Sequence, residues 1–209
     1  MTTLLSVQAN PRETHHSYSL RLLHDFLAAF KEAHPDSDVH HLNLYRDHVP
    51  VVDYDTFSGW GKIANNEELS HTEKQKVDRM GELRDQFMAA DYVVVAAPMW
   101  NFSYPPMVKA YIDCIVSAGH TFKYEADGTP VGLLDDRPVV LIEARGGIYS
   151  EGPAKDLEHT ESYMKDIMGL MGIRTVPVIR CEGVAAKPDQ AEAIYEKAKV
   201  EAEQVARDL

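Results

Sequence analysis

The sequence has few cysteines and no long apolar run, and each absence excludes a class of protein. Cys114 and Cys181 are the only cysteines and neither belongs to a CxxC motif, so a disulfide framework or a zinc site is not expected. Both lie in apolar stretches, where free thiols are usually buried and unreactive. No apolar run approaches a membrane span, which needs about 20 residues, so we expect no membrane partner.

Positive charge is also scarce. The 209 residues include 21 Lys and Arg against 33 Asp and Glu, which gives a formal net charge of −12. Such a chain repels nucleic acid and anionic membranes at long range, so an anionic ligand must be held locally by backbone N–H groups or a single Arg. Residues 1–8 lack the basic and long apolar regions of a signal peptide, and we expect a cytoplasmic protein.

Two further site types lack their motifs. The pairs His15-His16 and His40-His41 are adjacent, whereas the histidines of a zinc helix stand four residues apart, and no triad of Cys or carboxylate residues accompanies them. A GxSxG elbow is absent, which argues against a Ser-His-Asp hydrolase. We therefore predict no metal ligands and no hydrolytic triad.

Apolar patterns alternate between strand-like and helix-like segments along the whole chain. Strands are expected over 3–8, 39–44, 91–98, 137–144 and 175–181, and helices over 17–34, 54–63, 70–89, 105–116, 156–172 and 188–208. Ser17 is the expected N-cap of the first helix, and Ser70 with Glu73 forms a capping-box pattern. Residues 119–134 carry aromatic side chains and the turn Asp127-Gly128, which predicts an irregular hairpin.

Strands that alternate with helices, with no linker or repeat, predict one doubly wound α/β domain over residues 1–209. The segment 91–98 is a continuous apolar run, as is typical of a central strand buried on both faces, and 137–144 is assigned as a second buried strand. The segment 39–44 mixes His with Leu, and 175–181 contains Pro177, so both are assigned to sheet edges. The resulting order, 2-1-3-4-5, is that of a flavodoxin-like parallel sheet with helices on both faces.

Ligands of such sheets bind beyond the carboxyl ends of the strands, and the loop at 9–19 follows the first strand. It contains no glycine, which excludes a Walker loop and a GxGxxG turn. It ends at a helix N-terminus, where free N–H groups and the hydroxyls of Ser17 and Ser19 suit a phosphate. The alternative is that Ser17 only caps the helix.

Two other loops at this edge suit an aromatic ring. Residues 98–102 (PMWNF) place two aromatic side chains and an amide at a strand end, although they could equally plug the sheet. In residues 144–147 (ARGG), paired glycines allow close backbone approach, and Arg145 could neutralise a phosphate or an electron-rich ring. The alternative is an ordinary glycine turn with a solvated Arg. One ligand, flavin mononucleotide (FMN), would explain all three loops.

Four segments also carry a resemblance to a known family: residues 49–51 (VPV), 98–102 (PMWNF), 118–124 (AGHTFKY) and 145–153, which contains Arg145-Gly146-Gly147 and Glu151-Gly152-Pro153. In this combination the sequence resembles the FMN-dependent NADH-azoreductases over nearly its whole length. Members of that family are flavodoxin-like, homodimeric reductases of quinones and azo dyes. The resemblance therefore implies bound FMN, NADH or NADPH as electron donor, and two-electron ping-pong transfer to a quinone or azo acceptor.

The resemblance also implies which residues bind the flavin. The phosphate loop corresponds to Asn10, Ser17, Tyr18 and Ser19, and the ring contacts correspond to Met99, Trp100, Asn101, Phe102, Ala144, Arg145, Gly146 and Gly147. No catalytic side chain is implied, because the flavin carries the chemistry. Phe122 is a candidate for shaping the stacking site, with plain packing of the hairpin as the alternative. The family's dimer places its flavins near the subunit interface, where partner residues can complete each pocket.

Three departures from the family pattern concern the acceptor and the choice between NADH and NADPH. Trp100 stands where Tyr is common, Asn10 where Ser is frequent, and the loop with His15 and His16 is slightly longer. Two other functions stay open: an electron-carrier flavodoxin with a protein partner, and a flavin-free scaffold domain. The aromatic hairpin argues against the carrier, because it would build a small-molecule pocket.

Overall fold

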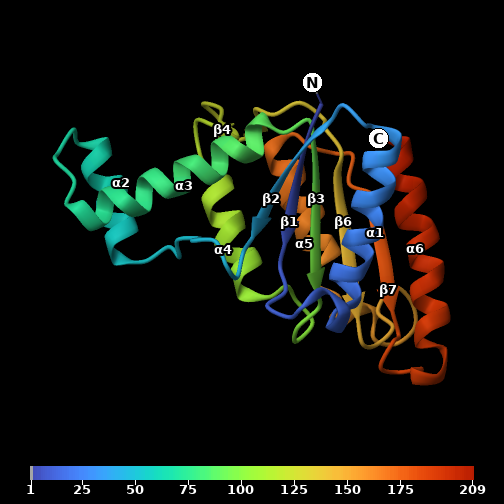
Figure 1. Ribbon diagram of the computed structural model, residues 1–209. Helices are drawn as coiled ribbons and strands as arrows, with labels where there is room; N and C mark the ends of the chain where they lie inside the picture. Colours follow the sequence, from blue (N-terminus) through green and yellow to red (C-terminus); the bar gives the residue numbers. More distant parts are fainter. Residues whose placement is uncertain (1) are drawn as a thin grey trace.

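A parallel sheet forms the centre of the fold in the computed structural model, which describes residues 2–209 (Figure 1). Its strands are β1 (Thr3–Gln8), β2 (Asp38–Asn43), β3 (Tyr92–Pro98), β6 (Val139–Arg145) and β7 (Val178–Glu182). They are ordered β2-β1-β3-β6-β7. The predicted flavodoxin-like order is therefore confirmed, with both weak strands at the edges.

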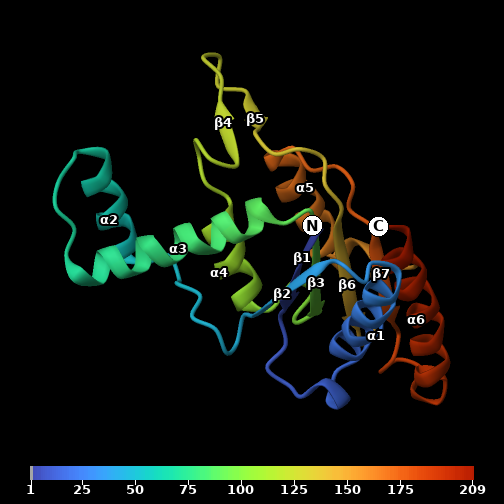
Figure 2. The same cartoon turned by 45° about the horizontal axis from the view of Figure 1, so that its top comes forward.

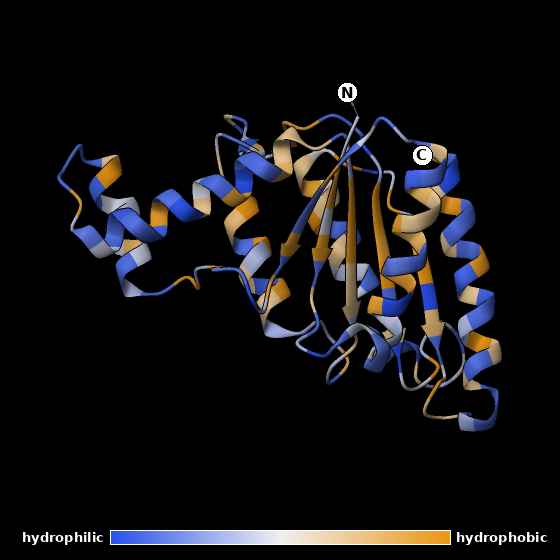
Figure 3. Ribbon diagram, viewed as in Figure 1, coloured by the Kyte–Doolittle hydropathy of each residue, from blue (hydrophilic) through white to orange (hydrophobic). Residues whose placement is uncertain are grey.

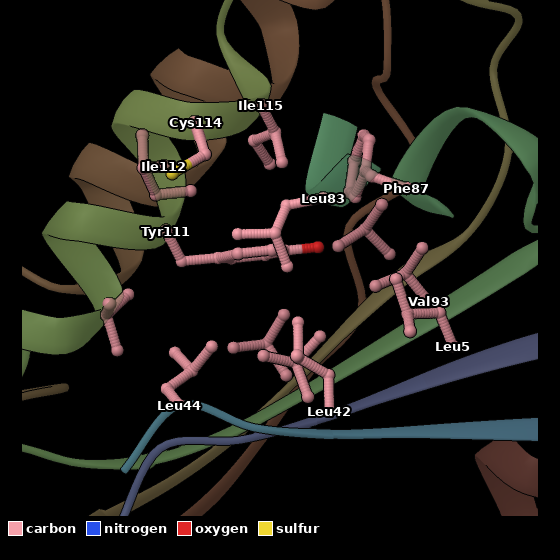
Figure 4. Close-up of a cluster of buried hydrophobic side chains, with 14 of the residues drawn as sticks. Leu5, Leu42, Leu44, Leu83, Phe87, Val93, Tyr111, Ile112, Cys114 and Ile115 are labelled. Carbon is pink, nitrogen blue, oxygen red and sulfur yellow. The ribbon is translucent and has the colours of Figure 1, made fainter. Parts of the chain in front are cut away.

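The central strands β3 and β6 are largely apolar because both faces of the sheet are covered, and β6 becomes charged only near its carboxyl end, at Glu143 and Arg145 (Figure 3). Successive side chains point to opposite faces. Val93 and Val95 join one cluster of buried residues, and Val94 joins another. The first cluster, part of which is drawn in Figure 4, includes Tyr111 and Leu83 and lies under the helices α3, α4 and α5. The second lies under α1 and α6, so the two layers of helices sandwich the sheet.

The helices are α1 (Tyr18–Ala33), α2 (Tyr54–Ala64), α3 (His71–Ala89), α4 (Pro106–Ile115), α5 (Glu161–Met171) and α6 (Ala191–Asp208), with 3₁₀ turns η1 (Thr14–His16), η2 (Lys155–Leu157) and η3 (Pro188–Gln190). Ser17 caps α1 by accepting from the Leu20 N–H, and Ser70 with Glu73 forms the capping box of α3. Both caps were predicted and are confirmed.

The fifth helix begins later than the predicted residue 156. The Glu158 carboxylate accepts the N–H groups of Thr160 and Glu161, at 2.6 and 2.8 Å, and so ends the preceding loop and starts α5. Sequence periodicity does not reveal such a cap, because it depends on where one side chain folds back. The last helix is likewise preceded by a separate turn, η3, rather than beginning at Pro188.

Two segments project from the sheet. The helices α2 and α3 form an arm, and the strands β4 (Phe122–Tyr124) and β5 (Pro130–Gly132) form the predicted irregular hairpin (Figure 2). The hairpin leaves the amino end of the sheet, where Leu134 N–H donates to the Met171 carbonyl at the end of α5. The arm and the hairpin therefore extend beyond the core that the sheet provides.

The burial of the two cysteines agrees with the expectation from composition. Cys114 and Cys181 are both buried, and burial raises the pKa of Cys114 to about 12 and that of Cys181 to about 11. Both thiols therefore stay protonated at neutral pH. Across residues 2–209, none of the helices combines the length and the apolar character needed to cross a membrane.

Glu73 ties the two helices of the arm together. Its carboxylate accepts from Ser58 Oγ at 2.6 Å, Lys62 Nζ at 2.8 Å and the Ser70 N–H at 2.7 Å. These donors, Lys62 foremost, lower the pKa of Glu73 to about 2 from an ordinary 4.5. A carboxylate with a lowered pKa stabilises the fold above its unfolded pKa, and this contribution disappears as the pH falls through the folded value.

We therefore expect Glu73→Gln to lower the melting temperature at pH 7. The difference from the wild type should shrink as the pH falls from about 4.5 towards 2, because the wild-type carboxylate is then protonated. Melting curves followed by circular dichroism at both ends of this range test the prediction. Glu68→Gln on the exposed surface is the control, and an equal effect of both changes would contradict the role of Glu73.

Candidate functional site

The three loops singled out in the sequence meet at the carboxyl end of the sheet. Ala9 N–H donates to the Ala96 carbonyl and Met99 N–H donates to the Ala144 carbonyl, both at 2.9 Å. These bonds continue the ladders of β1 with β3 and of β3 with β6, so the loops leave the sheet side by side at the arrowheads in Figure 1. The predicted convergence of the loops is present in the structure.

In the first loop, the polar side chains face one another rather than solvent. Asn10 Nδ2 donates to Ser17 Oγ at 2.8 Å, and the Ser17 and Ser19 hydroxyls lie 3.1 Å apart. All three residues are buried, Ser19 completely, so the hydroxyls are not turned outward as expected for phosphate donors. The N–H groups of Tyr18 and Ser19 begin α1 and donate to no acceptor within residues 2–209. Backbone donors and the helix dipole are thus what this loop offers an anion.

The second loop is a strained hairpin turn. Trp100 and Ser103 exchange two backbone hydrogen bonds, at 2.8 and 3.0 Å, around Asn101 and Phe102. These two residues have φ angles of 50° and 69°, a left-handed conformation that is rare for a residue as bulky as Phe. Neither N–H donates to a group of the described chain. Strain of this kind is concentrated at functional sites, and here it leaves two backbone donors free.

The third loop is held by its carbonyl groups. The carbonyl oxygens of Arg145 and Gly147 accept from the Gly183 N–H at 3.0 and 2.9 Å, and that of Gly146 accepts from Ala185 at 3.0 Å. The N–H groups of Gly146 and Gly147, by contrast, have no acceptor in residues 2–209. The loop is therefore anchored on one side and presents unpaired donors on the other.

The Arg145 side chain differs from both expectations for it. Its guanidinium is 0% exposed and its Nε donates to Glu143 Oε2 at 3.0 Å, while Nη2 lies 3.3 Å from Glu158 and 3.2 Å from Thr160. Glu143 stands two residues earlier on the same face of β6, which brings the opposite charges together inside the protein. The guanidinium therefore neither faces a ligand nor lies in solvent, and only the backbone of Arg145 can contact one.

This ion pair is the centre of a buried network that joins the loops. Tyr104, after the second loop, donates its hydroxyl to Glu143 and also has its pKa raised by burial and by that carboxylate. Thr160 Oγ1 donates to Glu143 at 2.9 Å. His159 N–H donates to the Phe102 carbonyl at 3.0 Å, so the segment before α5 supports the strained turn.

The network residues Tyr104, Glu143, Glu158 and Thr160 were not identified from the sequence. One signal was available: Glu143 interrupts the apolar run of a fully buried strand. A carboxylate in such a position requires a buried partner. Glu158 could not be recognised from the sequence, because its partners come together only in the folded chain. Burial would raise its pKa, but hydrogen bonds from Thr160 and Glu161 and the charge of Arg145 lower it.

Aromatic rings flank the free N–H groups. Trp100 and Phe102 are large side chains that stay 38% and 42% exposed at this edge. Tyr45, which follows β2, lies with its ring centroid 6.2 Å from that of Trp100, and Tyr149 lies 6.0 Å from Phe102. Apolar walls with a few backbone donors suit a flat, polar heteroaromatic ligand, and the nearby start of α1 suits a phosphate on the same molecule.

Phe122 does not belong to this edge within one chain. It lies on β4 at the amino end of the sheet, is buried, and packs edge-to-face against Tyr124 at 5.4 Å (Figure 2). Within the single chain, Phe122 therefore packs in the hairpin, which was the alternative to a role in the stacking site.

Comparison with known proteins agrees with the predicted resemblance. Residues 2–206 match the Flavodoxin_2 family model, which describes a flavodoxin-like fold. The FMN-dependent NADH:quinone oxidoreductase of Geobacillus kaustophilus is 46% identical over 209 residues, and the FMN-dependent NADH:quinone oxidoreductase 2 of Bacillus subtilis is 44% identical over 210. In both cases the alignment covers 99% of this chain and 99% of the relative.

Solved structures give the same result. An azoreductase from Bacillus anthracis superposes with a TM-score of 0.94 at 39% identity, with full coverage of both chains. A FMN-dependent NADH-azoreductase from the same species, solved in complex with FMN, superposes with a TM-score of 0.90 at 32% identity over 99% of this chain and 100% of that one. The resemblance inferred from the sequence is therefore confirmed.

The buried ion pair leads to a prediction about stability. Arg145→Met should lower the free energy of unfolding by about 3–5 kcal/mol, because it leaves the Glu143 carboxylate buried without its cation. The double variant Glu143→Leu/Arg145→Met should recover part of this loss. Urea denaturation measures both. Arg46→Met removes an exposed pair with Glu13 and should cost less than about 1 kcal/mol; a similar small loss for Arg145→Met would contradict the central role of the pair.

Proposed function

The chain belongs to the Flavodoxin_2 family, and from that premise we propose that it binds FMN and reduces quinones and azo compounds with electrons from NADH or NADPH. One observation supports this most strongly. At the carboxyl end of the sheet, backbone N–H groups of three loops lack acceptors in residues 2–209 and lie among exposed aromatic rings. Unpaired donors of this kind require a ligand or water, and a flavin accepts hydrogen bonds along the edge of its ring.

The residues present fit FMN in two parts. The N–H groups of Tyr18 and Ser19 at the start of α1 would hold the phosphate, with Asn10 and Ser17 fixing the loop beneath them. The ring would lie against the two strand-end loops formed by Met99, Trp100, Asn101, Phe102, Ala144, Arg145, Gly146 and Gly147. Arg145 contributes through its backbone only, because its guanidinium is enclosed by carboxylates.

When bound, FMN supplies the redox chemistry by accepting a hydride from the reduced nicotinamide and passing two electrons to the acceptor. The protein orients the reactants. N–H groups of Asn101, Phe102, Gly146 and Gly147 are fixed dipoles that favour negative charge at the edge of the ring. Trp100 and Phe102 would shield the bound ring from water. We assign no catalytic side chain.

We further propose that the active form is a cytoplasmic homodimer. The arm exposes large apolar side chains that no part of the described chain covers, among them Tyr54 at 85% and Phe57 at 66%. Between the arm, α4 and the hairpin lies a cavity of about 530 Å³ lined by Trp60, Ile63 and Phe122. Exposed apolar side chains beside a mainly apolar cavity are typical of an interface. In a two-fold dimer, the hairpin of one chain could bring Phe122 to the FMN of the other.

Anaerobic mixing of the FMN-loaded protein with NADH tests the proposed reaction. We expect rapid two-electron bleaching of the visible flavin absorbance, and its return when a benzoquinone is added. A protein that ignores added FMN would contradict the cofactor. Tight FMN binding without bleaching by NADH or NADPH would contradict the reductase and favour an electron carrier with a protein partner.

The dimer is tested by Phe57→Glu, which places a charge in the apolar surface of the arm. We expect the wild type to sediment as a dimer and the variant as a monomer, because an unpaired charge cannot be buried at an interface without large cost. Val200→Glu is a matched control, since Val200 is 67% exposed on α6, away from the arm. A monomeric wild type, or dimers of all three proteins, would contradict this interface.

A further inference from the structure

We infer that Tyr149 is a further residue in contact with the aromatic ring bound at this site, and that Glu182 of β7 positions it. The inference rests on the proposed function and adds to it two side chains that the resemblance does not assign. Tyr149 belongs to the segment after Gly147, and Glu182 to the edge strand beside it. Three independent sets of contacts support their roles.

The first is the contact between Tyr149 and Gly147. The φ angle of Gly147 does not lie in the left-handed region, so the backbone conformation alone does not require glycine there. The Tyr149 ring occupies the space beside it: a Cβ added at Gly147 would lie 2.9 Å from both Cε2 and the hydroxyl oxygen of Tyr149. The aromatic ring therefore packs against the residue whose N–H is free to bind a ligand.

The second is the contact between Tyr149 and Phe102. Their rings meet edge-to-face, with centroids 6.0 Å apart and planes at 71°. The pair spans the strained turn and the glycine loop, and Phe102 stays 42% exposed. An aromatic pair held at an open edge contributes less to folding than a buried one, and it places two rings beside the unpaired donors.

The third is the anchor that holds this segment. Residues 148–151 make no backbone–backbone hydrogen bond within the described chain. Instead, one Glu182 carboxylate oxygen accepts the N–H groups of Tyr149 and Ser150, at 3.0 and 3.1 Å, and the other accepts the Ser150 hydroxyl. Arg145 Nη1, which has no hydrogen-bond partner in residues 2–209, lies 3.6 Å from the first oxygen.

The charge state of Glu182 agrees with an anchoring role. Burial would raise its pKa, but hydrogen bonds from Ser150 and from the N–H groups of Tyr149 and Ser150, together with the charge of Arg145, lower it. The carboxylate is thus ionised at neutral pH and holds two consecutive N–H groups by charge-assisted bonds. Glu182 acts through Tyr149 and touches no reactant, which makes it a positioning residue.

The test combines flavin fluorescence with steady-state kinetics. A tyrosine in contact with an excited flavin quenches its emission by electron donation, which phenylalanine does poorly. Fluorescence is compared in the Trp100→Phe background, because Trp100 is a second electron donor at the site. There we expect severalfold brighter FMN emission when either Tyr149→Leu or Tyr149→Phe is added. The KM for NADH should rise severalfold only in Tyr149→Leu, since Tyr149→Phe keeps the ring.

Glu182→Gln tests the positioning role. It keeps the size of the side chain but weakens the hold on residues 149 and 150, so we expect partly recovered fluorescence with a broadened distribution of lifetimes. Glu201→Gln on α6 and Tyr92→Phe at the amino end of the sheet are matched controls that should behave as the wild type. Melting curves of every variant establish that each one is folded.

The possible outcomes separate the two proposals. If the wild type binds FMN and reacts with NADH while Tyr149→Leu changes neither the fluorescence of the Trp100→Phe parent nor the wild-type KM, the role of Tyr149 is overturned and the proposed function stands. If Glu182→Gln equals the wild type while Tyr149→Leu changes both readouts, only the positioning role is overturned. If the wild type takes up no FMN, the proposed function and this inference fail together.

Discussion

The buried pair of Arg145 and Glu143 is the constraint on which the geometry of the site depends. Two opposite charges lie inside the protein at the end of β6, and their burial is tolerated because Tyr104 and Thr160 complete the hydrogen bonds of the carboxylate. Each of these partners comes from a different segment. The pair therefore fixes the glycine loop, the residues after the strained turn and the start of α5 relative to one another, and so sets the width of the opening between them.

In this arrangement the polar side chains stabilise the loops, and the backbone supplies the donors that are free to bind a ligand. Charged and hydroxyl side chains near the site are turned inward and occupied with one another, as Asn10, Ser17 and Arg145 illustrate. The groups left for a ligand are main-chain N–H donors and aromatic rings. An acidic chain with a net charge of −12 could thus hold an electron-rich, phosphorylated ligand locally, without a cluster of exposed cations.

Hydrophobic patterning predicted the fold well because the order of apolar and polar residues along a strand reflects which of its faces are buried. The unbroken apolar run at 91–98 identified a central strand, and Pro177 marked an edge. The positions of the three loops followed from the rule for carboxyl ends. Patterning could not predict three features that depend on contacts formed only in the folded chain. These are the direction of the Arg145 side chain, the late start of α5 and the distance of Phe122 from the loops.

The turn at Trp100–Ser103 separates two properties of the protein that usually change together. Its main chain offers two free donors, while its side chains Trp100 and Phe102 stay partly exposed. In the proposed complex the donors would hold the cofactor, and the exposed rings would border both the cofactor and the incoming acceptor. Substitutions at these positions that keep the left-handed backbone would alter the acceptors accepted while leaving the cofactor held as before. Related proteins with such a turn could therefore differ in substrate range and still keep the main-chain donors that would bind the cofactor.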